Sequence, residues 1–367
     1  MSAAPRFLVS GYYGFGNTGD EAILAGLVEG FQELCPAAEL TVLSGSPADT
    51  MAEHGVIAVP RGLWSVRRQV KLCDALISGG GGLLQDVTSW RSPLYYLAAI
   101  HLAKAARRPV ACIGQSIGPL ERGWVRALAR REIARADAIG VRDDVSRRAL
   151  TELGVDRPAQ TTADLAFLLP RPTGAEIAAA REKAGLSDVN ERLAAVALRP
   201  LPHRRRKLQV SGLALAVDAA CRAVGLCPLL IPMHPSQDVE FARAVAAEMP
   251  MGARVAPMMR AREVLALVAS CDLVIAMRLH ALIFATLCSV PPVAISYDPK
   301  VDGLMEQLGL LSATCASPLE HFRLLGTTLA YWDRRADIHA ILAARLPHLR
   351  SLALCNVELA LSVLPRP

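Results

Sequence analysis

The chain has 367 residues, of which 52% are hydrophobic and 5% aromatic, and its formal net charge is +6. This length is sufficient for two domains with separate cores. The mild positive charge is compatible with an anionic substrate or an anionic membrane surface. The charge alone does not suffice for a nucleic-acid partner, for which we would expect basic patches interleaved with exposed aromatic residues.

Nine cysteines are dispersed along the chain, and none forms a Cys-x-x-Cys pair. This pattern predicts free thiols in a reducing compartment and no metal site of the zinc type. The first residues, MSAAPRFLVSGYYG, lack a charged segment followed by a hydrophobic one, so we expect no signal peptide and a cytoplasmic location. The uncharged run 279–297 is long enough to cross a membrane, but Pro291 and Pro292 interrupt it and favour a helix, a turn and a buried strand.

Strand-like and helix-like segments alternate along the first half of the chain. Apolar strands are expected at 6–10, 39–43, 75–78, 109–114 and 138–141, with helices over 20–34 and from 143 or 144. A second series has strands in LAAVALRP, CPLLIPM, CDLVIAM and PPVAISY, with helices over 237–248 and 262–270. Alternation of this kind predicts an α/β protein with parallel, doubly wound sheets.

The prolines in the segment PRPT, residues 170–173, favour a domain boundary. We expect an N-terminal α/β domain over 1–172 and a second α/β domain over 173–317. A helical tail is expected over 318–367, because apolar residues recur there at spacings of three and four, and it is expected to pack on one or both domains. Two facing Rossmann-like domains would bind a ligand in the cleft between them, at the carboxyl ends of their strands.

The segment GYYGFGNTGDE, residues 11–21, follows a strand and opens a helix. Its glycines, among them Gly14 and Gly16, let the backbone approach a ligand. The G-x-G-x-x-G spacing suggests a dinucleotide, but TVLSGS ends the second strand without the acidic residue that binds a ribose. The aromatic rings of Tyr12, Tyr13 and Phe15 suit a sugar ring better.

Polar side chains follow in the same loop. Asn17 and Asp20 can bind sugar hydroxyls, and Asp20 or Glu21 can deprotonate an attacking hydroxyl. The alternative for Asp20 is that it caps the helix.

Two further glycine-rich segments, SGGGGLLQD at 78–86 and GQSIGP at 114–119, are expected to be turns at the ends of strands. Gly80 and Gly81 would let the backbone approach a ligand at the same edge of the sheet. The alternative is that they serve close packing of a helix on a strand. Arg142 follows the strand of AIGVRD and is expected to point toward this edge of the sheet. The alternative is that it is a surface charge that flanks the next helix.

Arg199 ends the strand of LAAVALRP, where its planar guanidinium suits a carboxylate or a phosphate. The basic loop HRRRK at 203–207 is either solvated or in contact with a lipid diphosphate or a membrane. The segment WSVRR at 64–68 is likewise either solvated or in contact with a membrane.

Arg278 and His280 lie between the strand of CDLVIAM and an apolar helix, and Lys300 follows the next strand. Two cations and a helix N-terminus would bind an anion with two charged ends. His280 can act as an acid or base near neutral pH, or it can be structural. The helix ALIFATLCSV contains no acidic residue to hold a donor ribose, which argues against a nucleotide-sugar donor.

The segments SGYYGFGNTGDEAIL, SGGGGLLQD, GQSIGPL, MRLHALIFA and SYDPKV occur in this order. Together they resemble the bacterial cell-surface polysaccharide pyruvyl transferases of the type linked to surface-layer anchoring, over residues 7–310. The resemblance implies a GT-B-like fold and phosphoenolpyruvate as the donor, without a metal or redox cofactor. It also implies an N-acetylhexosamine acceptor, such as N-acetylmannosamine, in a lipid-linked cell-wall oligosaccharide. Peripheral contact with the inner membrane face is one of the two alternatives for the basic segments at 64–68 and 203–207.

The resemblance also implies roles for individual residues. The resemblance places His280 at the donor site and Asp20 on the acceptor side; as a mechanistic hypothesis, both would be catalytic, with His280 acting either as the proton donor or as a phosphate ligand. The donor would be bound by Arg199, Arg278, Leu279 and Lys300. The acceptor would be bound by Tyr13, Phe15, Asn17 and Arg142. One departure is that Pro200-Leu201-Pro202 follows Arg199, where an aromatic residue is common in the family.

Three other functions stay open at this stage. A GT-B glycosyltransferase with a nucleotide-sugar donor is the nearest alternative, and binding of a UDP-sugar without binding of phosphoenolpyruvate would favour it. A non-catalytic sugar-binding protein that keeps the fold is the second. A dinucleotide oxidoreductase is the third.

Overall fold

A computed structural model describes residues 4–87, 89–186, 188, 190–201, 206–317 and 319–365. The chain forms two compact units. Unit 1 contains the N-terminal residues to Phe15, then Asp20–Leu169, and the chain from His348 onward; unit 2 contains Gly16–Gly19 and Pro170–Pro347. The main boundary in the chain is therefore at Leu169 and Pro170, whereas the residues 16–19 belong to unit 2, which the sequence did not predict.

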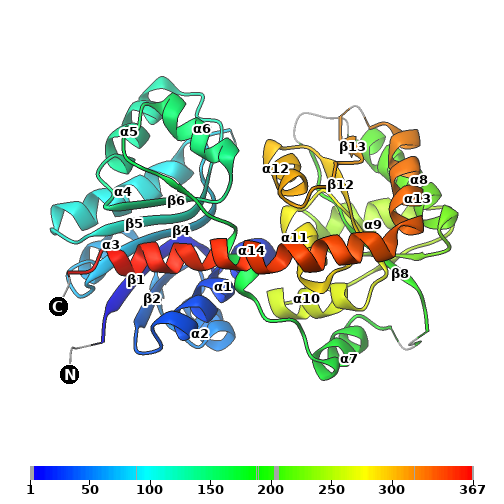
Figure 1. Ribbon diagram of the computed structural model, residues 1–367, viewed down its shortest axis with the longest axis horizontal. Coiled ribbons are helices and arrows are strands. Elements are labelled where there is room, and N and C mark those ends of the chain that lie inside the picture. Colours follow the sequence, from blue (N-terminus) through cyan, green and yellow to red (C-terminus); the bar gives the residue numbers. More distant parts are fainter. Residues whose placement is uncertain are drawn as a thin grey trace. The chain divides into compact units, whose positions relative to one another are not determined.

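Unit 1 is built on a parallel sheet of seven strands in the order β3-β2-β1-β4-β5-β6-β7 (Figure 1). The strands are β1 (Arg6–Tyr13), β2 (Glu39–Ser44), β3 (Ile57–Pro60), β4 (Ala75–Leu84), β5 (Val110–Ile117), β6 (Ala138–Val141) and β7 (Gln160–Thr161). The helices are α1 (Thr18–Leu34), α2 (Pro47–His54), α3 (Leu63–Gln69), α4 (Arg91–Ala105), α5 (Gly123–Ile133) and α6 (Asp144–Leu153). The strand order reverses between β1 and β4, as in doubly wound folds.

Both faces of this sheet are buried, which explains why apolar residues dominate both faces of its strands. Leu8 and Leu76 face a core that includes residues of α3, α4, α5 and α6. Their neighbours Phe7 and Ile77 point to the opposite face and are also buried. Successive side chains of a strand are thus buried on opposite faces of the sheet, as expected when helices cover both faces.

The glycine-rich segment of β4 is a bulged strand and not the predicted strand-to-helix turn. β4 continues through all four glycines to Leu84, its pairing with β5 shifts register between Gly81 and Leu84, and α4 begins only at Arg91. Gly80 has φ +54°, and a Cβ on it would lie 2.1 Å from Cγ2 of Ile23. β5 likewise continues to Ile117, so the turn predicted at 114–119 is also wrong for most of its length.

Unit 2 is built on a parallel sheet of six strands in the order β10-β9-β8-β11-β12-β13. The strands are β8 (Leu193–Ala197), β9 (Cys227–Leu230), β10 (Arg254–Val255), β11 (Leu273–Ala276), β12 (Pro292–Ser296) and β13 (Thr314–Cys315). The helices are α7 (Gly174–Lys183), α8 (Arg206–Ala223), α9 (Val239–Ala247), α10 (Ala261–Ala269), α11 (Leu279–Cys288) and α12 (Pro299–Gln307). The four predicted strands and the helices over 237–248 and 262–270 are confirmed.

The run 279–297 forms α11, a left-handed turn at Ser289 and β12, as the two prolines predicted. Within the described residues, no helix combines the length and the apolar character that a membrane span requires.

The tail is helical, as predicted, with α13 (His321–Asp333) and α14 (Arg335–Ser362). It is not a separate segment: α13 and the first part of α14 belong to unit 2, whereas the chain from His348 belongs to unit 1. In the unit 1 part, Arg350 donates to the carbonyl of Leu168 at 3.0 Å and pairs with Glu33 at 2.6 Å.

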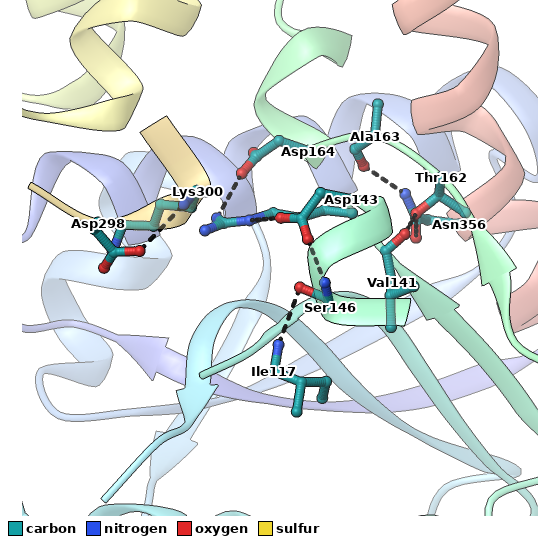
Figure 2. A network of polar contacts seen from close by, with 11 residues as sticks. Ile117, Val141, Asp143, Ser146, Thr162, Ala163, Asp164, Asp298, Lys300 and Asn356 are labelled. Carbon is teal, nitrogen blue, oxygen red and sulfur yellow. Dashed lines mark hydrogen bonds and ion pairs between the residues drawn. The ribbon is translucent and has the colours of Figure 1, made fainter. Parts of the chain in front are cut away.

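The fully buried amide of Asn356 in α14 bonds to β5 and to the segment after β7, and Figure 2 shows its contacts with Thr162 and Ala163. Its oxygen accepts from the Gly114 N–H at 2.7 Å and from the Thr162 hydroxyl at 2.9 Å. Its nitrogen donates to the carbonyl of Ala163 at 2.9 Å. The end of the chain is thereby fixed to β5 and to the segment after β7.

We expect Asn356→Ala to lower the free energy of unfolding of unit 1 by about 2–4 kcal/mol, because it leaves the Gly114 N–H and the Ala163 carbonyl buried without their partner. Urea denaturation followed by tryptophan fluorescence measures this change. Ser351→Ala, an exposed change on the same helix, should have little effect. Equal stability of the two variants would show that the amide does not hold the tail.

Candidate functional site

The carboxyl ends of the central strands of unit 2 gather three of the predicted cations. Arg199 lies two residues after β8, Arg278 lies two residues after β11, and Lys300 follows β12 in the first turn of α12. This clustering follows from the parallel sheet, because all strand ends of one polarity meet at one edge. His234 joins them from the segment after β9.

Arg278 is held in place by a carboxylate that the sequence analysis missed. Asp238 is fully buried and pairs with Arg278 through both carboxylate oxygens, with the Nε contact at 2.9 Å. The same carboxylate accepts from the Met233 N–H at 3.1 Å. Asp238 occupies the N-cap position of α9 but makes no cap hydrogen bond, because its side chain is engaged by Arg278. The pair fixes Arg278 and largely neutralises its charge.

Arg199 is held differently, by the phenol of Tyr297. Its Nη1 donates to the Tyr297 hydroxyl at 3.1 Å, and its guanidinium carbon lies 4.8 Å from the centroid of that ring. Among the described residues, no carboxylate forms an ion pair with Arg199. Its positive charge therefore remains available for an anion.

Tyr297 lies between two cations. Burial alone would raise the pKa of its hydroxyl, but the positive charges of Lys300 and Arg199 outweigh burial and lower that pKa below the ordinary value. The Lys300 ammonium is 5.6 Å from the ring centroid and pairs with Asp298 at 3.0 Å. Asp298 also caps α12 by accepting from the Lys300 N–H.

His280 packs against the first glycine loop. It is the second residue of α11, directly after Leu279, whose side chain is buried. A Cβ on Gly19 would lie 2.2 Å from Nδ1 of His280, so only glycine fits there. The same loop segment is fixed by a hydrogen bond from the Thr18 N–H to the Met233 carbonyl at 2.9 Å. The His280 ring thus lies against the start of α1.

In unit 1, the aromatic residues of the first loop take two different positions. Tyr12 and Phe15 are stacked, with ring centroids 4.4 Å apart, and Phe15 is exposed. Tyr13 is 1% exposed and its hydroxyl donates to the Gly79 carbonyl at 3.3 Å, so it stabilises the loop rather than facing a ligand. The stacked pair is the part of this loop that suits a sugar ring.

Arg61, which the sequence analysis did not identify, completes an aromatic cluster in unit 1. Its guanidinium carbon lies 5.0 Å from the ring centroid of Phe15 and 4.2 Å from that of Tyr95. Arg61 directly follows β3, at the same edge of the sheet at which β1 ends. This cluster combines aromatic faces with a cation and can hold a sugar that carries negative charge.

The polar residues of the loop serve the start of α1 in part. The side-chain oxygen of Asn17 accepts from the Gly19 N–H at 3.2 Å, so Asn17 makes a cap contact at the start of α1. Glu21 is buried, accepts from the Gly14 N–H at 2.8 Å and contacts His54 at 3.3 Å, which makes it a structural carboxylate. Asp20 is the partly exposed acid of the loop.

The glycines of unit 1 bring backbone segments close together. Gly14 has φ +75°, and a Cβ on it would lie 2.1 Å from the Ser44 hydroxyl. A Cβ on Gly81 would lie 2.9 Å from the Asp20 carboxylate, which places Asp20 beside the bulge of β4. Gly16, which belongs to unit 2, has φ +69° and lies near Pro235.

Arg142 is buried between two carboxylates of unit 1. It is 5% exposed and contacts Asp164 at 3.1 Å and Asp143 at 3.5 Å. Asp143 caps α6 through the Ser146 N–H at 2.6 Å, and the Ser146 hydroxyl accepts from the Ile117 N–H at 3.2 Å (Figure 2). The network indicates that Arg142 orders the ends of β5 and β6.

The basic loop at 203–207 is only partly described: Arg204 and Arg205 lie outside the described residues, and Arg206 and Lys207 begin α8. Among the described residues, no group of three or more His, Cys, Asp or Glu side chains is arranged to hold a metal ion.

A family model described as polysaccharide pyruvyl transferase matches residues 17–299. The amylovoran biosynthesis protein AmsJ of Erwinia amylovora is 26% identical over 280 residues, which cover 69% of this chain and 64% of AmsJ. The chain thus spans less than two thirds of the length of this relative.

Solved structures share the fold at low sequence identity. A structure of S. aureus MnaA with UDP has a TM-score of 0.66 and 11% identity, and covers 99% of both chains. A glycosyltransferase from Rickettsia africae has a TM-score of 0.66 and 10% identity over 98% of each chain. The glycotransferase of kitacinnamycin has a TM-score of 0.62 and 12% identity, with complete coverage. The GT-B-like fold is thereby confirmed.

The charges around His234 lead to a prediction that needs no substrate. Burial lowers the pKa of His234, and the charges of Arg278 and Arg199 lower it further, whereas Asp238 raises it. Arg278→Gln removes a positive charge and leaves Asp238 unpaired, so we expect the pKa of His234 to rise. An NMR titration of the histidine ring signals measures it. An unchanged or lower pKa would contradict this account of the cluster; Arg192→Gln, at the opposite end of β8, is the control.

Proposed function

Since this chain belongs to the polysaccharide pyruvyl transferase family, we propose that it transfers the pyruvyl group of phosphoenolpyruvate to two hydroxyls of a sugar in a polysaccharide precursor. The observation that carries the donor assignment is the cation cluster of unit 2. Arg199 has no carboxylate partner among the described residues, and Lys300 lies beside the same phenol. Phosphoenolpyruvate has a carboxylate and a phosphate, and it therefore suits such a cluster.

The reaction balances without an external oxidant or reductant. The C2–C3 double bond of phosphoenolpyruvate opens, its π electron pair takes a proton at C3, and C2 forms bonds to the two sugar oxygens. The bond between C2 and the phosphate oxygen breaks, and phosphate leaves with the electron pair of that bond. The two hydroxyls lose two protons, of which one balances the proton gained by C3 and the other is taken up by phosphate.

The donor side is assigned to unit 2. Arg199 and Lys300 bind the carboxylate and the phosphate and offset the negative charge that grows as phosphate leaves. Arg278 shapes the same edge, where its pairing with Asp238 keeps it in one orientation. His280 gives a proton to C3 or binds phosphate. Tyr297 is a second candidate proton donor, because the two cations lower the pKa of its hydroxyl.

The acceptor side is assigned to unit 1. Tyr12 and Phe15 offer a stacked aromatic face for a sugar ring, and Arg61 adds a positive charge beside it. Asp20 is the acid that takes the hydroxyl proton, because it is partly exposed beside the bulge of β4, whereas Glu21 is buried. An N-acetylhexosamine such as N-acetylmannosamine, in a lipid-linked oligosaccharide, is the acceptor that we propose.

Phosphate release from phosphoenolpyruvate, with and without a soluble N-acetylmannosaminide, tests the reaction. We expect acceptor-dependent release. Arg199→Gln should lower kcat/KM by about 100-fold, mainly through KM for phosphoenolpyruvate, because it removes the unneutralised cation. Arg192→Gln, an exposed arginine before the same strand, should stay near wild type. Binding of a UDP-sugar, with none of phosphoenolpyruvate, would contradict the proposal and favour a glycosyltransferase.

The contact between Gly19 and His280 gives an independent prediction. Gly19→Ala places a methyl group 2.2 Å from Nδ1 of His280, so the ring must move. We expect kcat to fall at least about tenfold. Gly174→Ala, also in the first turn of a helix but with no atom within 4 Å of the added carbon, should keep wild-type kcat. Full activity of Gly19→Ala would show that the position of His280 does not matter for turnover.

A further inference from the structure

Unit 1 has an apolar pocket between α3, α4 and α5, outside both parts of the candidate site. Its volume is about 620 Å³, and most of its lining is apolar, including Leu63, Leu94, Leu97 and Leu128. Leu63 is 53% exposed at the edge of the pocket, which therefore opens to the surface. A mainly apolar pocket of this volume falls in the range of pockets that bind ligands.

Three exposed tryptophans lie on or next to the helices that form this pocket. Trp64 lines the pocket and is 76% exposed. Trp90 and Trp124, at the starts of α4 and α5, are also exposed and contact each other edge to face at 5.8 Å. Three of the four tryptophans of the chain thus lie on these three helices or directly before them. Exposed indole rings are typical of membrane–water interfaces, where one edge is apolar and the other hydrated.

The charged side chains that are exposed to solvent at the pocket are arginines. Arg67 lines the pocket, and Arg68 follows it in the last turn of α3; both are exposed. Arg131, also in the lining, is 63% exposed. The acid among the lining residues is Glu132, which is 1% exposed and pairs with Arg131 and Arg135 at 2.8 Å each. An anionic surface that approaches the pocket would therefore be attracted by exposed arginines, and the lining would present no exposed carboxylate to repel it.

We propose that this face of unit 1 docks on a bilayer that contains anionic lipid. Leu63 and Trp64 enter the headgroup boundary, the pocket receives part of a lipid chain, and Arg67, Arg68 and Arg131 contact the lipid phosphates. The inference deepens the proposed function and rests on it in one respect, since a lipid-linked acceptor is presented at such a surface. Short apolar segments combined with arginines suit reversible attachment rather than insertion.

Co-sedimentation with vesicles tests the proposal. The full chain should bind vesicles of phosphatidylcholine and phosphatidylglycerol in equal parts, bind vesicles of phosphatidylcholine alone much more weakly, and lose most binding at about 1 M salt, where the Debye length falls to about 3 Å. The variant Trp64→Ala/Arg67→Glu should reduce the partition coefficient at least about tenfold, because it removes an apolar anchor and reverses one charge.

The matched control is Phe322→Ala/Arg243→Glu in unit 2. It removes an aromatic ring that is 89% exposed and reverses the charge of an exposed arginine, so its partition should equal that of the wild type. Wild-type protein that stays in the supernatant, or equal binding of the two double variants, would overturn the proposal. Light scattering that shows a dimer for the wild type and a monomer for Trp64→Ala/Arg67→Glu would also overturn it, since the face would then be an interface between two copies.

Activity toward the water-soluble acceptor separates this inference from the proposed function. Trp64→Ala/Arg67→Glu should keep wild-type phosphate release with that acceptor, because neither residue belongs to the candidate site. If the wild type binds anionic vesicles but never releases phosphate, the proposed reaction is wrong and the docking face is supported. If phosphate release is normal but no vesicle binding occurs, the docking face is wrong and the reaction stands.

Discussion

The donor side of unit 2 depends on the buried carboxylate of Asp238. A carboxylate without solvent is stable only when its charge and its lone pairs are satisfied, and here Arg278 and the Met233 N–H supply both. Loss of one partner from such a buried pair costs about 3–5 kcal/mol, so the pair is strongly maintained. It thereby fixes the exit of β9 to the start of α11, where His280 is the second residue.

The cations of the chain are neutralised to different degrees, and this difference indicates their functions. Arg142 lies between Asp143 and Asp164, and its buried charge is balanced within unit 1. Arg199 instead contacts a phenol, which orients the guanidinium without cancelling its charge. At an effective dielectric constant of about 20, two unit charges 4 Å apart interact by about 4 kcal/mol. A bound anion would therefore gain more from Arg199 than from an arginine that already has a carboxylate.

The fold could be predicted from the sequence because both sheets are parallel and buried on both faces. Continuous apolar strands and amphipathic helices then alternate visibly, and the strands of β8, β9, β11 and β12 were located within a few residues. Strand ends also located Arg199 and Arg278 at one edge. Strand ends did not identify Asp238 and Tyr297 as site residues. An acidic residue before a helix normally caps that helix, and a tyrosine after a strand normally lies on the protein surface. Only the tertiary contacts with the two arginines distinguish them.

The glycines of the G-x-G-x-x-G spacing, Gly14, Gly16 and Gly19, each have a local structural role in this chain. Gly16, the second glycine of the spacing, has φ +69°, a backbone conformation that favours glycine. Gly14 makes room for Ser44 at the end of the neighbouring strand. Gly19 makes room for the ring of His280, which is a side chain and not a pyrophosphate. Each glycine of the spacing therefore has its own local reason, a close contact at Gly14 and Gly19 and a left-handed backbone at Gly16, and the ring of His280 lies against the start of α1.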